Sequence, residues 1–316
     1  MKLLLPIIGA LALSLSTTSL FAQFYQPEPN KARAAMEDRV LLVEAEDFEC
    51  IANLEEVFPK YWKLHEKIWF KSASEISEIL RVNEPNKFMV LTADDREEVK
   101  VSQKKYQYAQ VFAFVLYPGE RANRRNDNVV ERDFVAKISF PSCITGEPEL
   151  KFLSESFQKV IEERAKVEDT GKKMKRVKVD YTRTLKVKEQ KLLIPKEGLS
   201  VPEDQIATYY PYPYEVVPAA ELYDRILKGE AGSLYPDILW SDSRFRWSIM
   251  LIDLGDYQVS MDARIQGYKE NMLKKNYDPK TEYLALLRGK IKIDITTLKY
   301  LAKEVVKAEQ KAASAR

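Results

Sequence analysis

The chain has 316 residues, of which 45% are hydrophobic and 31% are charged, a composition typical of globular proteins. Lysine and arginine number 50 against 48 aspartate and glutamate residues, which argues against a dedicated nucleic-acid-binding protein, because such proteins carry a strong basic excess. One histidine and two cysteines exclude a disulfide-rich scaffold, a zinc site with several histidines and a four-cysteine zinc site.

The first 22 residues have the features of a secretory signal peptide. Lys2 supplies the positive start, residues 3–15 form a short apolar run, and Ala22 precedes the expected cleavage point. A membrane-spanning helix needs about 20 apolar residues, whereas this run is shorter and contains Pro6. No cysteine near the cleavage point could accept a lipid. We therefore expect an exported protein, periplasmic or secreted and soluble, that is not a lipoprotein and has no membrane span after signal cleavage.

Export permits disulfide bonds, and the sequence offers one pair of cysteines, Cys50 and Cys143. The pair could form a single bridge. Two buried and inert thiols are the alternative, and the sequence leaves both open.

The first half of the chain predicts alternating strands and helices after a flexible spacer over residues 23–38. Short apolar runs indicate the strands, and apolar residues three and four apart indicate the helices. Ser72 and Glu75 have the spacing of a capping box, which opens the second helix. The predicted order is β-α-β-α-β-β-β-α, with strands at 40–43, 68–70, 88–91, 106–117 and 134–140 and helices at 51–61, 72–80 and 150–161.

The second half repeats this order, and most matching positions lie 146 to 153 residues apart. Its predicted strands are 192–194, 214–217, 237–240, 247–254 and 288–293, and its predicted helices are 201–210, 220–227 and the segment from residue 298 onward.

These repeated patterns predict an α/β fold with mixed α+β character. We expect two similar α/β domains from an internal duplication, over residues 39–168 and 190–316, each a mixed sheet with flanking helices. One larger mixed sheet is the alternative.

Between the two halves lies a basic segment, residues 169–189, that we expect to be a linker or a strand. Apolar and basic residues alternate in it, as in a strand with one buried face and one basic face. Its basic face could bind an anionic partner, although lysines on a strand more commonly protect a sheet edge. The candidate binding residues are Lys175, Arg176, Lys178, Lys186 and Lys188.

Carboxylates gather where predicted strands end. Glu44, Glu46 and Asp47 follow the first strand, and Asp94 and Asp95 follow the third. Ligands of open α/β sheets bind outside the carboxyl ends of the strands, so a cation site or an acid/base pair is conceivable here. Polar caps of the following segments are the alternative. We name Glu46, Asp47, Asp94 and Asp95 as an acidic candidate site and assign no catalytic or metal-binding residue.

Two further features bear on catalysis. His65 has charged neighbours, which predict an exposed turn rather than a catalytic base. Neither common glycine-rich phosphate-binding loop occurs in the sequence, so we expect no nucleotide and no cofactor.

Aromatic residues cluster at two matching places, Phe58–Trp62 and Tyr209–Tyr214. The second cluster alone would suggest a platform for a sugar or a peptide. Because both lie between a helix and the next strand, we interpret them as aromatic plugs that close the same corner of each domain.

The strand-helix-strand-helix order over residues 40–80, with its Ser-x-x-Glu helix start, resembles the small α/β domains of bacterial envelope proteins such as the amino-terminal domain of TolB. The resemblance implies a role in envelope interactions and transfers no functional residue. We expect an exported, non-catalytic envelope protein that binds another protein or an anionic polymer. A carboxylate-dependent hydrolase of glycosides or phosphoesters is the alternative.

Overall fold

The computed structural model describes most of the chain from residue 29 onward. The described residues are 29–48, 51–94, 97–102, 105–109, 112–122, 134–140, 146–166, 181–241, 246–264 and 293–314. The predicted signal peptide, Cys50 and Cys143 lie outside these ranges.

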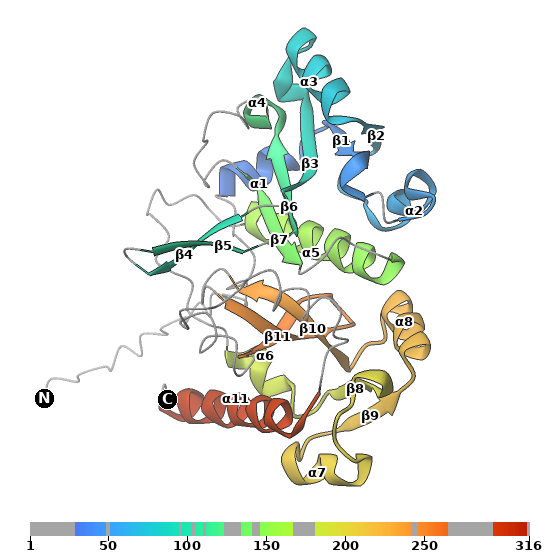
Figure 1. Cartoon of the computed structure of the whole chain (residues 1–316). Helices are drawn as coiled ribbons and strands as arrows, with labels where there is room; N and C mark the ends of the chain where they lie inside the picture. The colour runs from blue at the N-terminus through green and yellow to red at the C-terminus, as the bar shows by residue number, and fades with distance from the viewer. Residues whose placement is uncertain are drawn as a thin grey trace, which may run out of the picture.

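The described chain forms two domains, which we call the N-terminal and the C-terminal domain (Figure 1). The N-terminal domain contains α1 (Pro29–Ala35), β1 (Val40–Glu44), η1 (Ala45–Phe48), α2 (Leu54–Tyr61), β2 (Lys67–Lys71), α3 (Ala73–Val82), η2 (Pro85–Lys87), β3 (Phe88–Asp94), β4 (Glu97–Ser102), β5 (Lys105–Ala109), β6 (Phe112–Pro118), α4 (Gly119–Ala122), β7 (Ala136–Phe140) and α5 (Glu147–Ala165). The C-terminal domain contains α6 (Tyr181–Lys186), β8 (Lys191–Pro195), η3 (Lys196–Gly198), η4 (Glu203–Gln205), α7 (Ile206–Tyr209), β9 (Tyr214–Val217), α8 (Ala219–Lys228), β10 (Ser233–Ser241), β11 (Arg246–Asp253), β12 (Val259–Arg264) and α11 (Ile295–Ser314).

The two domains have sheets of the same topology. The strand order is β2-β1-β3-β6-β7 in the first sheet and β9-β8-β10-β11-β12 in the second. In each sheet the first three strands of this order are parallel to one another. The fourth strand is antiparallel to the third, and the fifth is antiparallel to the fourth. This arrangement confirms the expectation of two similar α/β domains, each with a mixed sheet and flanking helices.

Helices and sheets alternate as layers along the molecule (Figure 1). One face of the first sheet packs on α3 through Leu42 and Val90, and its other face packs on α5 through Leu41 and Val43. Helix α5 also covers the near face of the second sheet, whose far face packs on α6, α7 and α11. Because α5 is shared by both sheets, ten of its residues are buried, whereas α11 at the end of the stack buries four.

Two helices that the sequence analysis missed occupy equivalent places. Helix α1 precedes β1 and packs on α5, and α6 precedes β8 and packs on α11. The prediction of a flexible spacer is therefore wrong for residues 29–35, where Ala32 and Ala35 are fully buried. The prediction of a strand is wrong for residues 181–186, where Thr184 and the following Val187 face the core three positions apart.

One strand prediction needs correction, one strand was missed, and one prediction is largely untested. The long strand expected over residues 106–117 is two strands, β5 and β6, and β5 pairs with β4 in a separate antiparallel hairpin. The counterpart of β7 is β12, which the sequence analysis did not predict. The late strand expected at 288–293 lies mostly outside the described residues, and Ile293 forms an isolated bridge with Leu199.

Local sequence signals explain several element boundaries. The capping box at the start of α3 is present, because Ser72 Oγ accepts a hydrogen bond from the Glu75 backbone N–H while the Glu75 carboxylate accepts one from the Ser72 backbone N–H. Gly229 ends α8 in the left-handed conformation, with φ of 70°.

The aromatic corners act as plugs, as the sequence predicted. Trp62 and Tyr210 are the residues directly after α2 and α7, and both side chains are almost completely buried.

Candidate functional site

The sole histidine is part of the core rather than an exposed turn. His65 is 4% exposed, and its Nδ1 accepts a hydrogen bond of 3.0 Å from Trp62 Nε1. The accepting Nδ1 places the ring proton of the neutral tautomer on Nε2. Burial lowers the pKa of His65 to about 4. The imidazole therefore stays neutral near pH 7 and supports the aromatic plug.

The carboxyl ends of β1 and β3 bring two acidic side chains to one hydroxyl. Thr92 Oγ1 lies 2.7 Å from Glu44 Oε2 and 2.8 Å from Asp47 Oδ2. Asp47 Oδ2 also accepts a hydrogen bond from the Ala93 backbone N–H. A hydroxyl has one hydrogen, so Thr92 can donate to only one of the two carboxylates at a time. We call Glu44, Asp47 and Thr92 the acid–hydroxyl cluster.

The structure separates the four acidic residues named from the sequence. Asp47 meets the end of β3, as expected for neighbouring parallel strands. Glu46 is exposed on η1 and has no place in the acid–hydroxyl cluster. Asp94 ends β3, but its side chain lies outside the described part, as does all of Asp95. Sequence reasoning noted Glu44 without selecting it. It also passed over Thr92, whose position at the end of β3 was the available signal.

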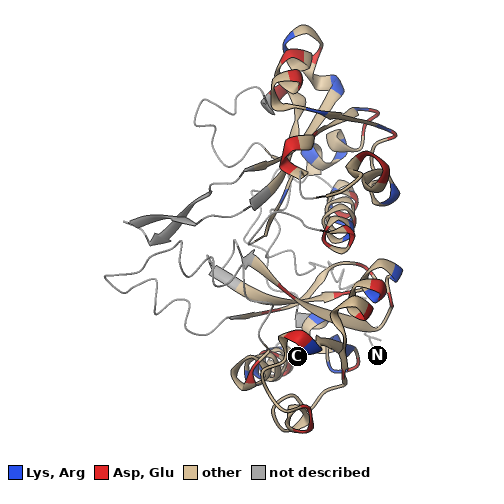
Figure 2. Cartoon of the chain, turned by 45° about the vertical axis from the view of Figure 1, so that its right-hand side comes forward, with Lys and Arg blue, Asp and Glu red and all other residues tan. Residues whose placement is uncertain are grey.

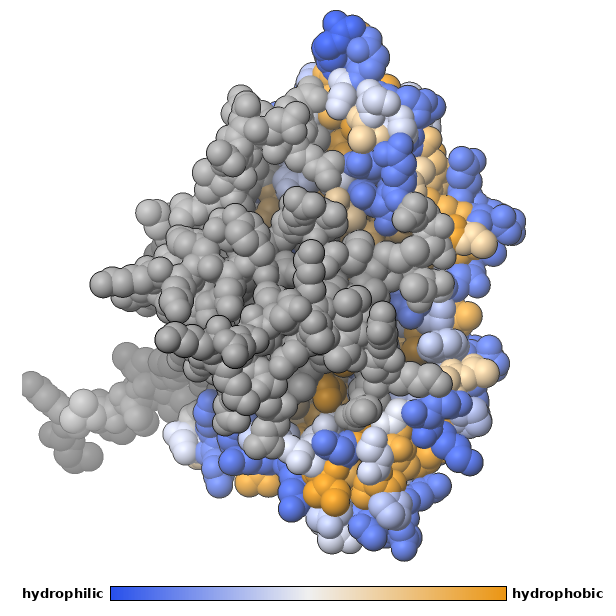
Figure 3. All heavy atoms as spheres, in the orientation of Figure 1, coloured by the Kyte–Doolittle hydropathy of each residue, from blue (hydrophilic) through white to orange (hydrophobic). Residues whose placement is uncertain are grey.

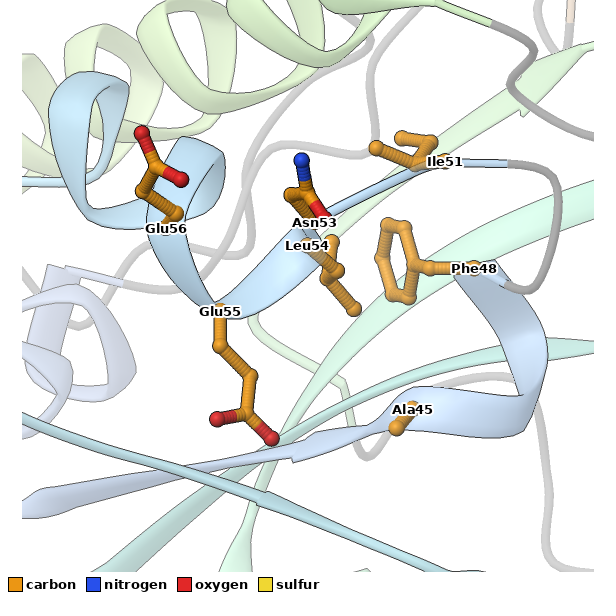
Figure 4. A pocket seen from close by; sticks show the side chains of 7 residues that line it. All are labelled: Ala45, Phe48, Ile51, Asn53, Leu54, Glu55 and Glu56. Carbon is orange, nitrogen blue, oxygen red and sulfur yellow. The ribbon is translucent and has the colours of Figure 1, made fainter.

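A pocket lies directly after β1, beside the acid–hydroxyl cluster. Its volume is about 460 Å³, and it is lined by Ala45, Phe48, Ile51, Asn53, Leu54, Glu55 and Glu56. The apolar side chains gather on one side of this space, and the two glutamates extend from the first turn of α2 (Figure 4). Asn53 permits the sharp entry into α2 because it adopts the left-handed conformation, with φ of 56°. The pocket thus offers apolar walls with acidic groups near them.

The C-terminal domain places a different polar residue at the position of Thr92. Across the strands, Thr92 lies opposite Val115 and Lys137, and in the second sheet Asp237 lies opposite Met250 and Asp262. Asp237 faces α5, where burial and the nearby Glu149 raise its pKa to about 7. Its Oδ1 accepts a hydrogen bond of 2.7 Å from the Ile238 backbone N–H.

The domain contact around α5 combines aromatic packing with hydrogen bonds. The ring centres of Phe152 and Tyr235 are 6.4 Å apart and the rings are nearly perpendicular. Ser156 Oγ donates a hydrogen bond of 2.7 Å to the Tyr257 carbonyl. Lys151 Nζ donates one of 2.6 Å to the carbonyl of Leu227 in the last turn of α8, where a cation interacts favourably with the helix dipole. These contacts hold α5 against the second sheet, on the face to which Asp237 also belongs.

The predicted basic residues divide into two groups. Lys175, Arg176 and Lys178 lie outside the described residues. Lys186 is exposed at the end of α6, and Lys188 Nζ forms an ion pair of 2.6 Å with Glu309 on α11. Acidic and basic residues are interspersed over the helices of both domains (Figure 2).

Sequence reasoning missed a lysine stripe on α11. Lys299, Lys303, Lys307 and Lys311 are all exposed and recur every four residues. Residues four apart lie on the same face of a helix, so these lysines follow one side of α11, opposite the side that Leu298 and Val305 bury. The four-residue spacing was the signal in the sequence. Together with Lys186 at the end of the neighbouring α6 and Lys188 two residues after it, we call this the α6–α11 basic surface.

Within the described ranges, no group of three or more histidine, cysteine, aspartate or glutamate residues is placed to hold a metal ion. No helix among the described residues combines the length and apolar character needed to cross a membrane. In comparisons with known proteins, no family model, curated protein or solved structure matches the chain.

Proposed function

We propose that the chain is an exported, non-catalytic protein of the cell envelope, periplasmic or secreted, that binds another envelope protein or an anionic polymer. The α6–α11 basic surface is the proposed contact region. It combines residues from two segments that are more than 100 positions apart in the sequence, joined by the ion pair between Lys188 and Glu309.

The observation that carries this proposal is the lysine stripe on α11. Four lysines on one helix face span three turns, or about 18 Å at 1.5 Å per residue. Within this row, Lys307 forms an ion pair with Glu304 on the same helix. A solvated helix needs no such one-signed row, whereas an anionic chain or acidic surface can pair with every lysine in it.

The environment of the reactive side chains agrees with binding rather than catalysis. His65 is buried and hydrogen-bonded to Trp62. Asp47 accepts a hydrogen bond from the Ala93 backbone N–H, and the single hydroxyl hydrogen of Thr92 goes either to Asp47 or to Glu44. These groups stabilise the core and the strand ends of the N-terminal domain.

The proposal is tested by retention of the exported chain on immobilised polyphosphate, with neutral dextran as the reference. Replacing Lys299, Lys303, Lys307 and Lys311 by glutamine should abolish retention. A matched control replaces four lysines of the N-terminal domain, namely Lys60, Lys63, Lys87 and Lys159, by glutamine and should be retained like the unchanged chain. Equal retention of both variants would refute the contact region, and passage of the unchanged chain through both columns would refute polyanion binding.

A second candidate function rests on the acid–hydroxyl cluster beside the pocket. A carboxylate-dependent hydrolase of glycosides or phosphoesters needs a pair of carboxyl groups near a substrate pocket. Glu44 and Asp47 converge on Thr92, and their sequence neighbours Ala45 and Phe48 line the pocket. If this candidate is right, the chain hydrolyses chromogenic glycosides or phosphoesters, and Asp47→Asn abolishes this activity. Glu46→Gln is the control and should keep the activity, because Glu46 lies on the same turn but is exposed. Turnover with that pattern would overturn the non-catalytic proposal.

A further inference from the structure

The edge strand β2 exposes an unusual row of side chains. It pairs with β1, with Leu42 opposite Trp69, and among the described strands it has no second neighbour. Since side chains alternate along a strand, Lys67, Trp69 and Lys71 lie on one face. Trp69 is 44% exposed, and its ring centre is 6.1 Å from that of Phe88. One large aromatic therefore stands between two lysines at the free edge of the sheet.

The C-terminal domain provides an internal reference for this position. Its edge strand β9 pairs with β8, and Glu215 lies opposite Leu193 where Trp69 lies opposite Leu42. Glu215 accepts hydrogen bonds from Arg225 and from Lys191, which lower its pKa to about 2. The same fold thus accommodates a fully paired polar group at this place, so the architecture does not require an exposed tryptophan.

Phe88, whose ring lies beside Trp69, is likewise replaced by a polar residue in the C-terminal domain. Phe88 begins β3 opposite Val40, and its counterpart, Ser233, begins β10 opposite Lys191. Helix α3, which packs against β2, also ends in Val82, the most exposed large apolar residue of the described chain at 60%. Apolar residues appear among hydrophilic ones on the visible side of both domains (Figure 3), so the difference between them is local to this edge. The N-terminal domain is thus the more apolar of the two at this edge.

The charges at this edge favour an acidic partner. Lys71 forms an ion pair of 3.0 Å with Glu75. Lys67 is exposed, and no ion pair joins it to another described residue. An acidic side chain opposite Lys67 would form the cross-strand charge pair that neighbouring strands use, and an apolar side chain two residues along would lie against Trp69.

We propose that β2 is a docking edge for an extended segment of a partner protein, which adds a strand to the first sheet and presents an acidic residue to Lys67 and an apolar residue to Trp69. The free backbone N–H and C=O groups of an edge strand supply the main-chain hydrogen bonds. Lysines can also serve to keep such an edge unpaired, and the experiment below separates the two roles. This surface is distinct from the α6–α11 basic surface, so either can exist without the other.

The test uses fluorescein-labelled ten-residue peptides with threonine at every second position, in which the positions between, all on one face of an extended strand, alternate glutamate with valine or lysine with valine. Anisotropy should show that the exported chain binds the acidic peptide in preference to the basic one. Trp69→Ala should weaken this binding at least tenfold, whereas Tyr223→Ala, which removes a similarly exposed aromatic residue from the C-terminal domain, should leave it unchanged. The variant without the α11 lysines should still bind, so failure here and failure of the proposed function are distinguishable.

A charge exchange guards against a variant that merely unfolds. Lys67→Glu should lower the affinity for the acidic peptide and raise it for the basic one, which a folding defect cannot do. The proposal is overturned if neither peptide binds, if Trp69→Ala binds like the unchanged chain, or if Lys67→Glu leaves the preference for acidic peptide intact.

Discussion

Lys299 Nζ lies 5.0 Å from the centre of the Tyr209 ring, and 148 positions earlier Lys151 Nζ lies 5.7 Å from the centre of the Tyr61 ring. Both lysines belong to the last helix of their domain, and both tyrosines end the helix before the aromatic plug. The two domains therefore share a cation–π contact at the same place. The contact differs in its surroundings, because Lys151 also reaches the carbonyl of Leu227 in the other domain.

Replacing Lys151 by methionine should destabilise the protein more than replacing Lys299. Lys151→Met removes a charge-assisted hydrogen bond at the domain interface and leaves a carbonyl unpaired, a loss of about 2 kcal/mol. Lys299→Met removes an exposed cation–π contact worth about 0.5–1 kcal/mol. Urea unfolding of both variants measures the difference. Equal losses would show that the bond from Lys151 to Leu227 contributes nothing to stability.

Most strands and helices of the fold follow from local patterns in the sequence. Apolar runs such as residues 40–43 mark buried strands, and Ser72 with Glu75 marks a helix start. Helix α1 escaped prediction because it buries two alanines, whose small side chains give little hydrophobic pattern. Helix α6 escaped because positions 184 and 187 fit a helical spacing while the neighbouring residues also alternate. The shared α5 layer depends on contacts between domains, which no local pattern records.

Lowering the pH from neutral should destabilise the fold through His65. Its pKa is about 4 in the folded protein and 6.5 in an unfolded chain, so the unfolded state binds more protons between these values. Stability is complete above pH 6.5 and falls by up to roughly 3 kcal/mol as the pH approaches 4.

His65→Gln separates this effect from other acid effects. Glutamine can still accept a hydrogen bond from Trp62 but does not titrate near neutral pH. Urea unfolding at pH 7.5, 6 and 5 should show a flatter dependence in this variant. Identical pH profiles for the two proteins would rule out His65 as the titrating group.

Asp237 should give stability the opposite pH dependence. Burial and Glu149 raise the pKa of Asp237 to about 7 in the folded protein, from 3.8 in an unfolded chain. The folded state therefore binds the Asp237 proton more tightly than the unfolded chain does. The stabilisation that this proton gives is fully present below pH 4 and is lost as the pH rises through 7. Asp237→Asn should be more stable than the unchanged chain at pH 8 and similar to it at pH 4.

Glu149→Gln provides the companion measurement, because it removes the charge on α5 that raises the pKa of Asp237. Urea unfolding of this variant should show a smaller loss of stability between pH 4 and pH 8. If Asp237→Asn lowers stability equally at both pH values, the carboxyl is ionised in the folded protein and this account of the interface is wrong.

Gly119 should not tolerate a side chain. A Cβ atom there would lie 2.2 Å from the Pro85 carbonyl oxygen and 3.0 Å from that of Phe88, both of which are backbone atoms. Gly119→Ala should therefore cost about 1–3 kcal/mol in unfolding free energy. Gly146→Ala is the matched control, since its Cβ would first meet the movable Glu149 side chain at 3.1 Å. Equal stability of the two variants would contradict the close approach of α4 to η2.

The candidate sites could be predicted less well than the fold. Strand ends identified the region of Asp47, because parallel strands bring their carboxyl ends to one edge. Residue type alone could not show that Glu46, one position earlier, is exposed. Residue type also could not show that His65 is buried, because its neighbours in the sequence are charged. Its burial depends on α1 and α5, which come from distant parts of the chain.

The salt dependence of polyanion binding tests the proposed function most directly. For a linear polyanion, the slope of log affinity against log salt concentration increases with the number of cationic contacts. Anisotropy titrations of labelled polyphosphate between 50 and 200 mM salt, roughly the range over which such contacts are screened, should give weaker binding and a shallower slope when Lys299, Lys303, Lys307 and Lys311 are replaced by glutamine. The same affinity and slope for this variant and the unchanged chain would contradict binding through the α6–α11 basic surface.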